Sequence, residues 1–315
     1  MNYEYTGAAA DLHDAVTQAA AAWDHPQPGT DVSQGETFTQ HWDLAVSLGW
    51  TTILDEVELA DEQGRELLEA AGAAVSALAR AGAKLPVRQT LLARSAAREA
   101  FDSAAVAVLY DGTGLWEPVA AFVVTPNGEL RTQIPGRAQD LDIAGRPLAT
   151  PVPRPVQLAG RQSVISNYLL LHEITGAVDG AVDLTRTYVD QRIQFGRPLS
   201  SIPAVKTTLG ELSVAQGQLH AALREVGRRL PETNTTLERL HFALASAREI
   251  AAVTAGFVAS TTHQLHGAMG ITAESGLHHR TTLLWADRDE GRTGADPSAL
   301  TEAQLWELTA PGVAS

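Results

Sequence analysis

Two segments of the chain gather residue types that can hold an anionic ligand. The first, Tyr188-Val-Asp-Gln-Arg-Ile-Gln-Phe-Gly-Arg-Pro-Leu199, carries an arginine, a glutamine and a phenylalanine in close succession. A guanidinium can donate two parallel hydrogen bonds to phosphate oxygens. The second, Gln264-Leu-His-Gly-Ala-Met-Gly-Ile-Thr-Ala-Glu274, places two glycines where a helix is expected to end. A backbone without Cβ atoms can approach a bulky ligand closely there.

Other kinds of site are excluded or disfavoured by residue content. The sequence has no cysteine, so disulfides, thiolate metal sites and a cysteine nucleophile are excluded, and a cytoplasmic location fits. His263 and His266 lie three residues apart on one predicted helix face. Two histidines without a third assured ligand are more often structural, so we predict no metal site.

Composition and charge limit the classes of partner. Hydrophobic residues make up 44% of the 315 residues and charged residues 19%, which is typical of a folded domain. The net charge of -14 argues against nucleic acid as a partner, because duplex binding needs clustered Lys and Arg. One or two arginines can still hold a diphosphate. The amino terminus has no basic region before an apolar run, and no apolar stretch approaches the roughly 20 residues that span a bilayer, so we expect neither export nor membrane insertion.

Periodicity predicts a mostly α fold with a small β domain. Apolar spacing predicts helices over 38–50, 61–81 and 89–100, and three longer ones through 171–189, 205–226 and 237–266. The last begins at a capping-box pair, Thr235 and Glu238. Short alternating runs separated by turn residues occupy 104–156. We therefore expect an N-terminal helical domain (1–103, with 1–35 a peripheral extension), a reduced β middle domain (104–156) and a C-terminal helical bundle (157–315).

This order of elements and the two segments resemble the acyl-CoA dehydrogenase family. Residues 188–199 are similar to the family's Y-x-x-x-R-x-Q-F-G-x-P-I, and residues 264–274 to its Q-x-H-G-G-M-G-Y-T-x-E. Weaker similarity covers WDLAVSLGW at 42–50 and LPVRQTLLA at 85–93. The chain is most similar to the short subunits of heteromeric (α2β2) bacterial acyl-CoA dehydrogenases.

The resemblance implies FAD as the cofactor, bound by the C-terminal half. In the family the arginine and glutamine of the first segment reach the FAD of a neighbouring subunit, which assigns that role to Arg192 and Gln194. The implied FAD-binding residues are Arg192, Gln194, Phe195, Gln264, Gly267, Ala268, Gly270, Thr272 and Glu274. Taken alone, Arg192 could be a solvent-facing helix end. Gly267 could be an ordinary helix C-cap, and both roles can hold together.

The resemblance also implies a catalytic carboxylate. The family reaction removes a proton from the carbon α to a thioester carbonyl, and desolvation can raise a glutamate pKa to suit that step. In many members this glutamate stands in a Glu-Gly pair about twenty residues beyond the second segment, which here offers Glu290; a solvated loop is its alternative. Glu173 is a weaker candidate for which a buried or paired structural role is favoured. In another branch the aligned position is Ser166, which cannot serve.

The chain departs from the family where the flavin ring would be covered. It lacks the T-E-P-x-A-G-S-D segment and the later tryptophan-bearing strand, so we expect a second, longer acyl-CoA dehydrogenase subunit to complete the site in a heterotetramer. The leading interpretation is a flavin-dependent acyl-CoA dehydrogenase subunit that acts on a steroid side-chain or other bulky acyl-CoA and passes electrons to an electron-transfer flavoprotein or similar acceptor. The alternatives are a non-catalytic scaffold subunit that contributes the adenosine side of the FAD site, and a flavin-free acyl-CoA-binding member.

Overall fold

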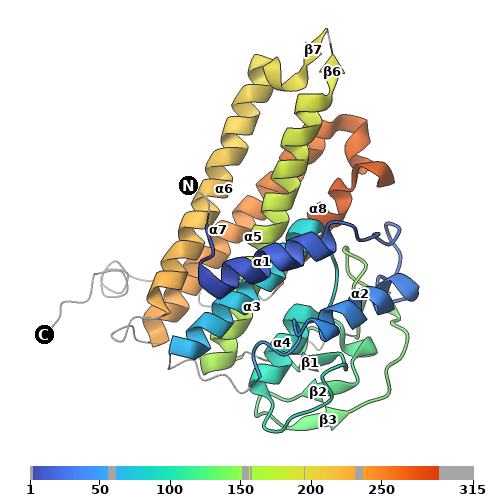
Figure 1. The fold of residues 1–315 in the computed structure, drawn as a ribbon, viewed down its shortest axis with the longest axis vertical. Helices are drawn as coiled ribbons and strands as arrows, with labels where there is room; N and C mark the ends of the chain where they lie inside the picture. Colours follow the sequence, from blue (N-terminus) through green and yellow to red (C-terminus); the bar gives the residue numbers. More distant parts are fainter. Residues whose placement is uncertain are drawn as a thin grey trace, which may run out of the picture.

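The computed structural model describes residues 3–55, 62–150, 156, 158–194, 196–230 and 237–290. Long helices form the upper part of the molecule in Figure 1, and short strands lie below them. The mostly α architecture with a small β region, expected from the sequence, is confirmed. The helices are α1 Gly7–Ala20, α2 Glu36–Ser47, α3 Glu62–Ala81, α4 Val87–Ala96, α5 Gly160–Gln191, α6 Pro203–Arg229, α7 Leu237–His266 and α8 Leu277–Asp289.

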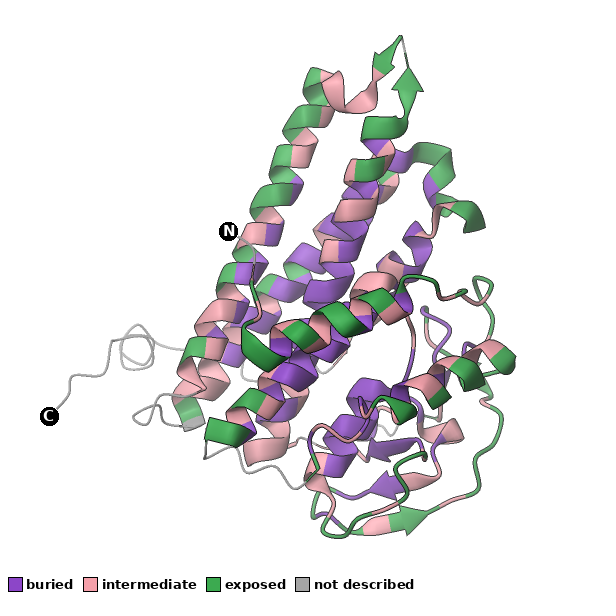
Figure 2. Cartoon of the chain, viewed as in Figure 1, coloured by how far each residue is buried: buried purple, intermediate pink, exposed green. Residues whose placement is uncertain are grey.

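The C-terminal bundle follows from the apolar stripes. Helix α5 packs against α6, α7 and α8, and it is buried on all sides over residues 168–178. The segment 238–271, which includes nearly all of α7, is long and apolar enough to cross a membrane by length and composition, with a mean hydropathy of 1.4 in an 18-residue window. Helix α7 packs on α5, α6 and α8 instead, as a core helix does. Burial is concentrated where these helices face one another (Figure 2).

Helices α3 and α5 approach each other at backbone distance. A Cβ atom on Gly176 would lie 2.0 Å from the carbonyl oxygen of Ser76, and one on Gly180 would lie 2.2 Å from that of Arg80. The facing side of α3 is rich in buried alanines. Small residues on both helices therefore allow a contact that any larger side chain would prevent.

The amino-terminal region contacts the rest of the fold. Within residues 1–35, expected to be a peripheral extension, α1 packs along α3 through one face, with Val16 and Ala20 almost fully buried. The Tyr3 amide also donates to Nδ1 of His220 on α6 (3.0 Å). An alanine-rich helix can lie close to a neighbouring helix and bury a small apolar face, which composition alone does not reveal.

The β region is small. Three strands form one sheet in the order β1-β2-β3, with β1 parallel to β2 and β2 antiparallel to β3. A separate two-stranded ladder pairs β4 with β5. These strands are β1 Ala107–Leu109, β2 Phe122–Val124, β3 Leu130–Thr132, β4 Asp140–Leu141 and β5 Pro147–Leu148. The division into three domains stays a prediction.

Helix α8 also differs from expectation. The polar run before Gly291 was considered a possible solvated loop, yet residues 277–289 form a helix whose Leu283, Leu284 and Asp287 are buried. Its polar residues are compatible with burial because arginines from other elements pair with them. Helix α8 thereby places Glu290, the residue after its last turn, in a mostly buried position. Thr235, of the expected capping box, lies outside the described residues.

Candidate functional site

The two sequence segments meet at one end of the bundle. Helix α5 ends at Gln191, after which β6 (Ile193–Gln194) pairs with β7 (Arg197–Pro198) in a hairpin closed by the Leu199 amide on the Arg192 carbonyl (2.9 Å). The Tyr188 hydroxyl donates to the carbonyl of His266, the last residue of α7 (3.3 Å), and the two rings stack 4.3 Å apart. This contact joins the segments in space.

The candidate donors point away from the chain's own core. Arg192, Gln194 and Gln264 are exposed. The same is true of Ala268 and Glu274, whereas Thr272 is half-buried. Figure 2 shows the hairpin end of the bundle as a mainly exposed surface. Phe195 lies outside the described residues. Such a surface is open to a cofactor or to another chain, and the charge on Arg192 suits a diphosphate.

The two glycines of the second segment have different roles. Gly267 has φ +58°, and a Cβ atom added there would meet only open space, so its left-handed backbone ends α7 as a C-cap and leaves room for a ligand. Gly270 is buried, and a Cβ there would lie 3.0 Å from His266 Cβ and 3.1 Å from His263 Nδ1. Gly270 therefore serves packing within the turn.

The paired histidines have structural partners. His263 Nε2 shares a hydrogen bond with Thr281 Oγ1 (2.9 Å), and its ring stacks on Trp285. His266 Nδ1 shares one with the Thr262 carbonyl (2.9 Å). In the part of the chain that the structure describes, no group of three or more His, Asp and Glu side chains is arranged to hold a metal ion.

The two candidate carboxylates converge on one arginine. Arg88 of α4 donates through Nη2 to both Glu290 oxygens (2.8 and 2.7 Å), and its Nε forms an ion pair with Glu173 of α5. The Arg88 side chain is 3% exposed, and those of Glu173 and Glu290 are 11% and 15% exposed. Glu173 is thus a paired, mostly buried carboxylate.

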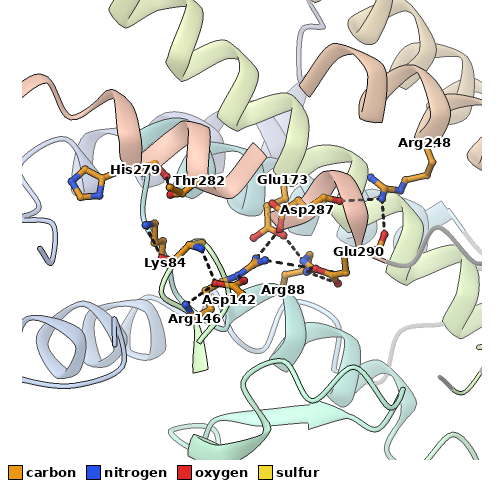
Figure 3. A network of polar contacts seen from close by, with 11 residues as sticks. Lys84, Arg88, Asp142, Arg146, Glu173, Arg248, His279, Thr282, Asp287 and Glu290 are labelled. Carbon is orange, nitrogen blue, oxygen red and sulfur yellow. Dashed lines mark hydrogen bonds and ion pairs between the residues drawn. The ribbon is translucent and has the colours of Figure 1, made fainter. Parts of the chain in front are cut away.

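Further charged groups extend this buried cluster (Figure 3). Arg146, from the turn between β4 and β5, pairs with Asp142 (2.6 Å) and with the fully buried Asp287 (2.7 Å). Arg248 of α7 donates to the carbonyls of Asp287 (3.2 Å) and Glu290 (2.9 Å). Three guanidinium groups thus face four carboxyl groups. Burial raises the pKa of Asp287 to about 7, against the opposing effect of Arg146.

The cluster sets the ionisation of Glu290. Burial opposes ionisation, but the guanidinium groups of Arg88 and Arg146 outweigh it and hold the pKa of Glu290 below its ordinary value. A general base works best with a pKa near the working pH. The contact of Glu290 with Arg88 also links the end of α8 to α4.

Comparisons with known proteins cover different shares of the chain. Residues 169–286 match the family described as "Acyl-CoA dehydrogenase, C-terminal domain". This part of the chain is therefore an acyl-CoA dehydrogenase C-terminal domain. Acyl-CoA dehydrogenase IpdE2 of Mycobacterium tuberculosis is 32% identical over 110 residues, 35% of this chain, and that of Mycolicibacterium smegmatis is 27% identical over 190 residues, 55% of this chain. The matched stretches span 32% and 57% of the length of these relatives.

Solved structures share the acyl-CoA dehydrogenase fold. A chain of the ChsE4-ChsE5 complex from Mycobacterium tuberculosis matches with a TM-score of 0.68 at 18% identity, over 98% of each chain. A chain of the Tcur3481-Tcur3483 steroid acyl-CoA dehydrogenase G363A variant matches with a TM-score of 0.60 at 18% identity, over 96% of this chain and 94% of that one. At these identities the likeness concerns the fold.

Sequence reasoning missed the residues that hold the carboxylates. Arg88 lies in the quoted LPVRQTLLA stretch, and Arg146 lies in a turn; neither was proposed for a role. An arginine among apolar residues in a short predicted helix indicates a buried ion pair, because a buried guanidinium needs a carboxylate partner. Its partners, 85 and 202 residues away, cannot be identified from spacing.

Proposed function

We propose that this chain is a subunit of a flavin-dependent acyl-CoA dehydrogenase that introduces an α,β double bond into an acyl-CoA thioester. One observation carries the proposal: the Tyr188–His266 contact joins two family segments at one exposed bundle end, where Arg192, Gln194 and Gln264 face outward. Outward donors suit a cofactor shared with another chain. A second, longer acyl-CoA dehydrogenase subunit would complete the site in a heterotetramer.

The residues at the bundle end fit FAD. The guanidinium of Arg192 would bind the diphosphate, and the amides of Gln194 and Gln264 would donate to other oxygens of the cofactor. Gly267 leaves the helix end open to it, beside Ala268, Thr272 and Glu274, while Phe195 would be an apolar wall. FAD, when bound, supplies the acceptor for the substrate hydride.

The base for the α proton comes, in this proposal, from the partner subunit. Glu290 and Glu173 share Arg88, and the lowered pKa of Glu290 makes it a weak proton acceptor. This chain would then contribute cofactor binding and assembly, which is the scaffold alternative. Base catalysis by Glu290 is the second candidate, because the carboxylate stands directly after α8 at the position that the family resemblance indicates.

The substrate and acceptor are inferred from relatives. The named ChsE4-ChsE5 complex supports a heteromeric assembly, and the Tcur3481-Tcur3483 steroid enzyme supports a bulky acyl-CoA such as a steroid side-chain thioester. An electron-transfer flavoprotein or similar acceptor in the cytoplasm would reoxidise the flavin. A flavin-free acyl-CoA-binding protein is the remaining alternative, and the absorption spectrum of the purified complex distinguishes it.

The experiment compares Arg192→Ala with a matched control, Arg197→Ala, in strand β7 of the same hairpin. Each variant is co-expressed with the longer subunit, and FAD content is measured by absorbance and protein assay. We expect Arg192→Ala to lose most of its FAD, since a charge-assisted contact contributes about 1.5–3 kcal/mol, or about tenfold to a hundredfold in affinity. Arg197→Ala should retain it.

Two results would count against the proposal. Equal FAD content in both variants would leave Arg192 as a surface residue. Stoichiometric FAD in the chain purified alone would show that no second subunit is needed to complete the site.

A further inference from the structure

A cavity that none of the proposed FAD-binding residues lines contains a lysine, two histidines and aromatic side chains. The cavity has a volume of about 200 Å³ and lies between the 23–26 segment, α2 and the turn from α3 to α4. Its lining includes Trp23, His25, Phe38, His41 and Lys84. The cavity thus combines aromatic walls with a cationic residue.

Lys84 has no acidic partner in the described part of the chain. Its Nζ donates to the carbonyl of Ala144 (2.7 Å), and no carboxylate among those residues lies within ion-pair distance. Asp142, whose charge acts on Lys84, is already paired with Arg146. Burial, together with Arg146, lowers the pKa of Lys84 to about 8. Among the described residues, Lys84 is therefore a partly buried cation whose hydrogen-bond partner is a neutral carbonyl, in a chain of net charge -14.

Two histidines and an arginine from the first turn of α8 lie close to the lining residues. The His25 ring stacks on His279 at 4.3 Å, and His279 lies against His278 at 3.8 Å. His279 is 5% exposed, and its Nδ1 has no hydrogen-bond partner among the described residues. Arg280 binds the carbonyls of Arg80 and Gly276. A Cβ on Gly82 would lie 3.0 Å from His279 Cβ, so the Lys84 turn packs directly on the first turn of α8.

The remaining wall is aromatic. His41 stacks on Trp23 with ring centroids 4.1 Å apart and an interplanar angle of 10°. Phe38, one turn before His41 on α2, also lines the cavity. Asp24, the acidic residue of the lining, is exposed. Lys84 is thus the cation of the lining, and His25, whose pKa burial lowers to about 4, is a neutral imidazole that can donate one hydrogen bond.

We propose that this cavity binds a small oxyanion, a phosphate or a carboxylate, with Lys84 as the principal charged contact and His25 as a second donor. The aromatic wall of Trp23, Phe38 and His41 suits a planar or apolar group attached to the anion. None of the residues proposed to bind FAD lines this cavity, so the anion proposal does not depend on the flavin proposal. Bound anion would satisfy the positive charge that the described part of the chain leaves uncompensated.

The test titrates the full chain separately with inorganic phosphate and with benzoate, at constant ionic strength set with sodium chloride. Thermal unfolding and isothermal titration calorimetry report binding. We expect at least one of the two anions to raise Tm and to bind saturably. Phosphate binding would indicate a phosphoryl ligand, and benzoate binding would indicate an aromatic carboxylate; either supports the site.

Single substitutions test whether the anion binds in this cavity. The sequence has two lysines, so Lys206→Met on the exposed face of α6 is the matched control for Lys84→Met. Lys84→Met should weaken anion binding about tenfold or more, and Lys206→Met should not. His25→Gln keeps the site polar and should weaken it less, which preserves the test if Lys84→Met misfolds. Binding of neither anion to the wild type, or equal binding by Lys84→Met or His25→Gln and the control, would overturn the proposal.

Discussion

At the scale of single residues, the geometry of Glu290 matters most. The position of a glutamate before a glycine suggests a catalytic base, but the chemistry of the side chain depends on what surrounds it. Here the carboxylate accepts two hydrogen bonds from Arg88 and lies near Arg146. Removing one partner from such a buried pair leaves an uncompensated charge, which is costly. The observed contacts therefore indicate a role in stability.

Glu290→Gln distinguishes stability from catalysis. The amide keeps the size of the side chain but gives Arg88 a weaker partner, so we expect the free energy of unfolding to fall by about 1–3 kcal/mol. Turnover of the assembled complex should stay within about threefold of the wild type. Urea unfolding and steady-state kinetics measure the two effects.

Asp289→Asn is the control for Glu290→Gln, because Asp289 is the adjacent acidic residue and its side chain is 59% exposed. Neither stability nor turnover should change much, since surface ion pairs contribute little. A loss of about 10²-fold in turnover for Glu290→Gln alone, with FAD retained, would instead assign the base to Glu290.

At the scale of elements, the contact of α3 with α5 fixes the rest of the fold. It joins the N-terminal helices to the C-terminal bundle, and it orients α5 so that Glu173 reaches Arg88. Gly176 and Gly180 lie four residues apart on the face of α5 that meets α3. Close backbone approach at these glycines is what places α4, α5 and α8 around the buried cluster.

Gly176→Ala should separate the two helices. The added Cβ would lie 2.0 Å from the Ser76 carbonyl oxygen, so a backbone shift is unavoidable, and overpacking of this kind costs about 1–3 kcal/mol. Gly210→Ala in α6 is the matched control because nothing lies within 4 Å of its Cβ position. That change should stabilise the chain by about 0.5–1 kcal/mol. Similar unfolding free energies for the two variants would contradict the close-contact account.

At the scale of the whole molecule, buried histidines make stability depend on pH. His172 is fully buried between α3 and α5, where its Nδ1 shares a hydrogen bond with the Tyr5 hydroxyl (2.8 Å). Burial lowers the pKa of His172 to about 3. The unfolded chain binds a proton at this residue below about pH 6.5, whereas the folded chain does not. The contribution of His172 is therefore fully present above that pH and is lost progressively as the pH falls toward 3.

His172→Gln removes this dependence. We expect the difference in unfolding free energy between wild type and variant to shrink by about 1 kcal/mol from pH 7.5 to pH 5.5. Urea unfolding of both proteins at the two pH values measures it. Comparing the proteins with each other cancels other titrating groups, including Asp287, whose raised pKa acts in the opposite direction. A difference that stays constant with pH would mean that His172 is protonated equally in both states.

Much of the architecture could be predicted from periodicity. The helices through 62–81, 203–229 and 237–266 match the predicted ranges closely, because each carries a continuous apolar face. Helix α8 was missed since its buried positions include Asp287 and His279, which do not register as apolar. The packing of α1 on α3 could not be predicted from the sequence, because alanine occurs on both exposed and buried helix faces.

The sequence by itself determined the order of elements, the small β region and the two family segments, since these depend on local composition and on spacing within a few helical turns. Only the tertiary structure decided what the charged residues do. Arg88, Glu173 and Glu290 come from three separate helical regions, and the ionisation of Glu290 depends on the burial and the guanidinium groups that they bring together. Electrostatic energy depends on distance in space and on access to water, and neither quantity is encoded in separation along the chain.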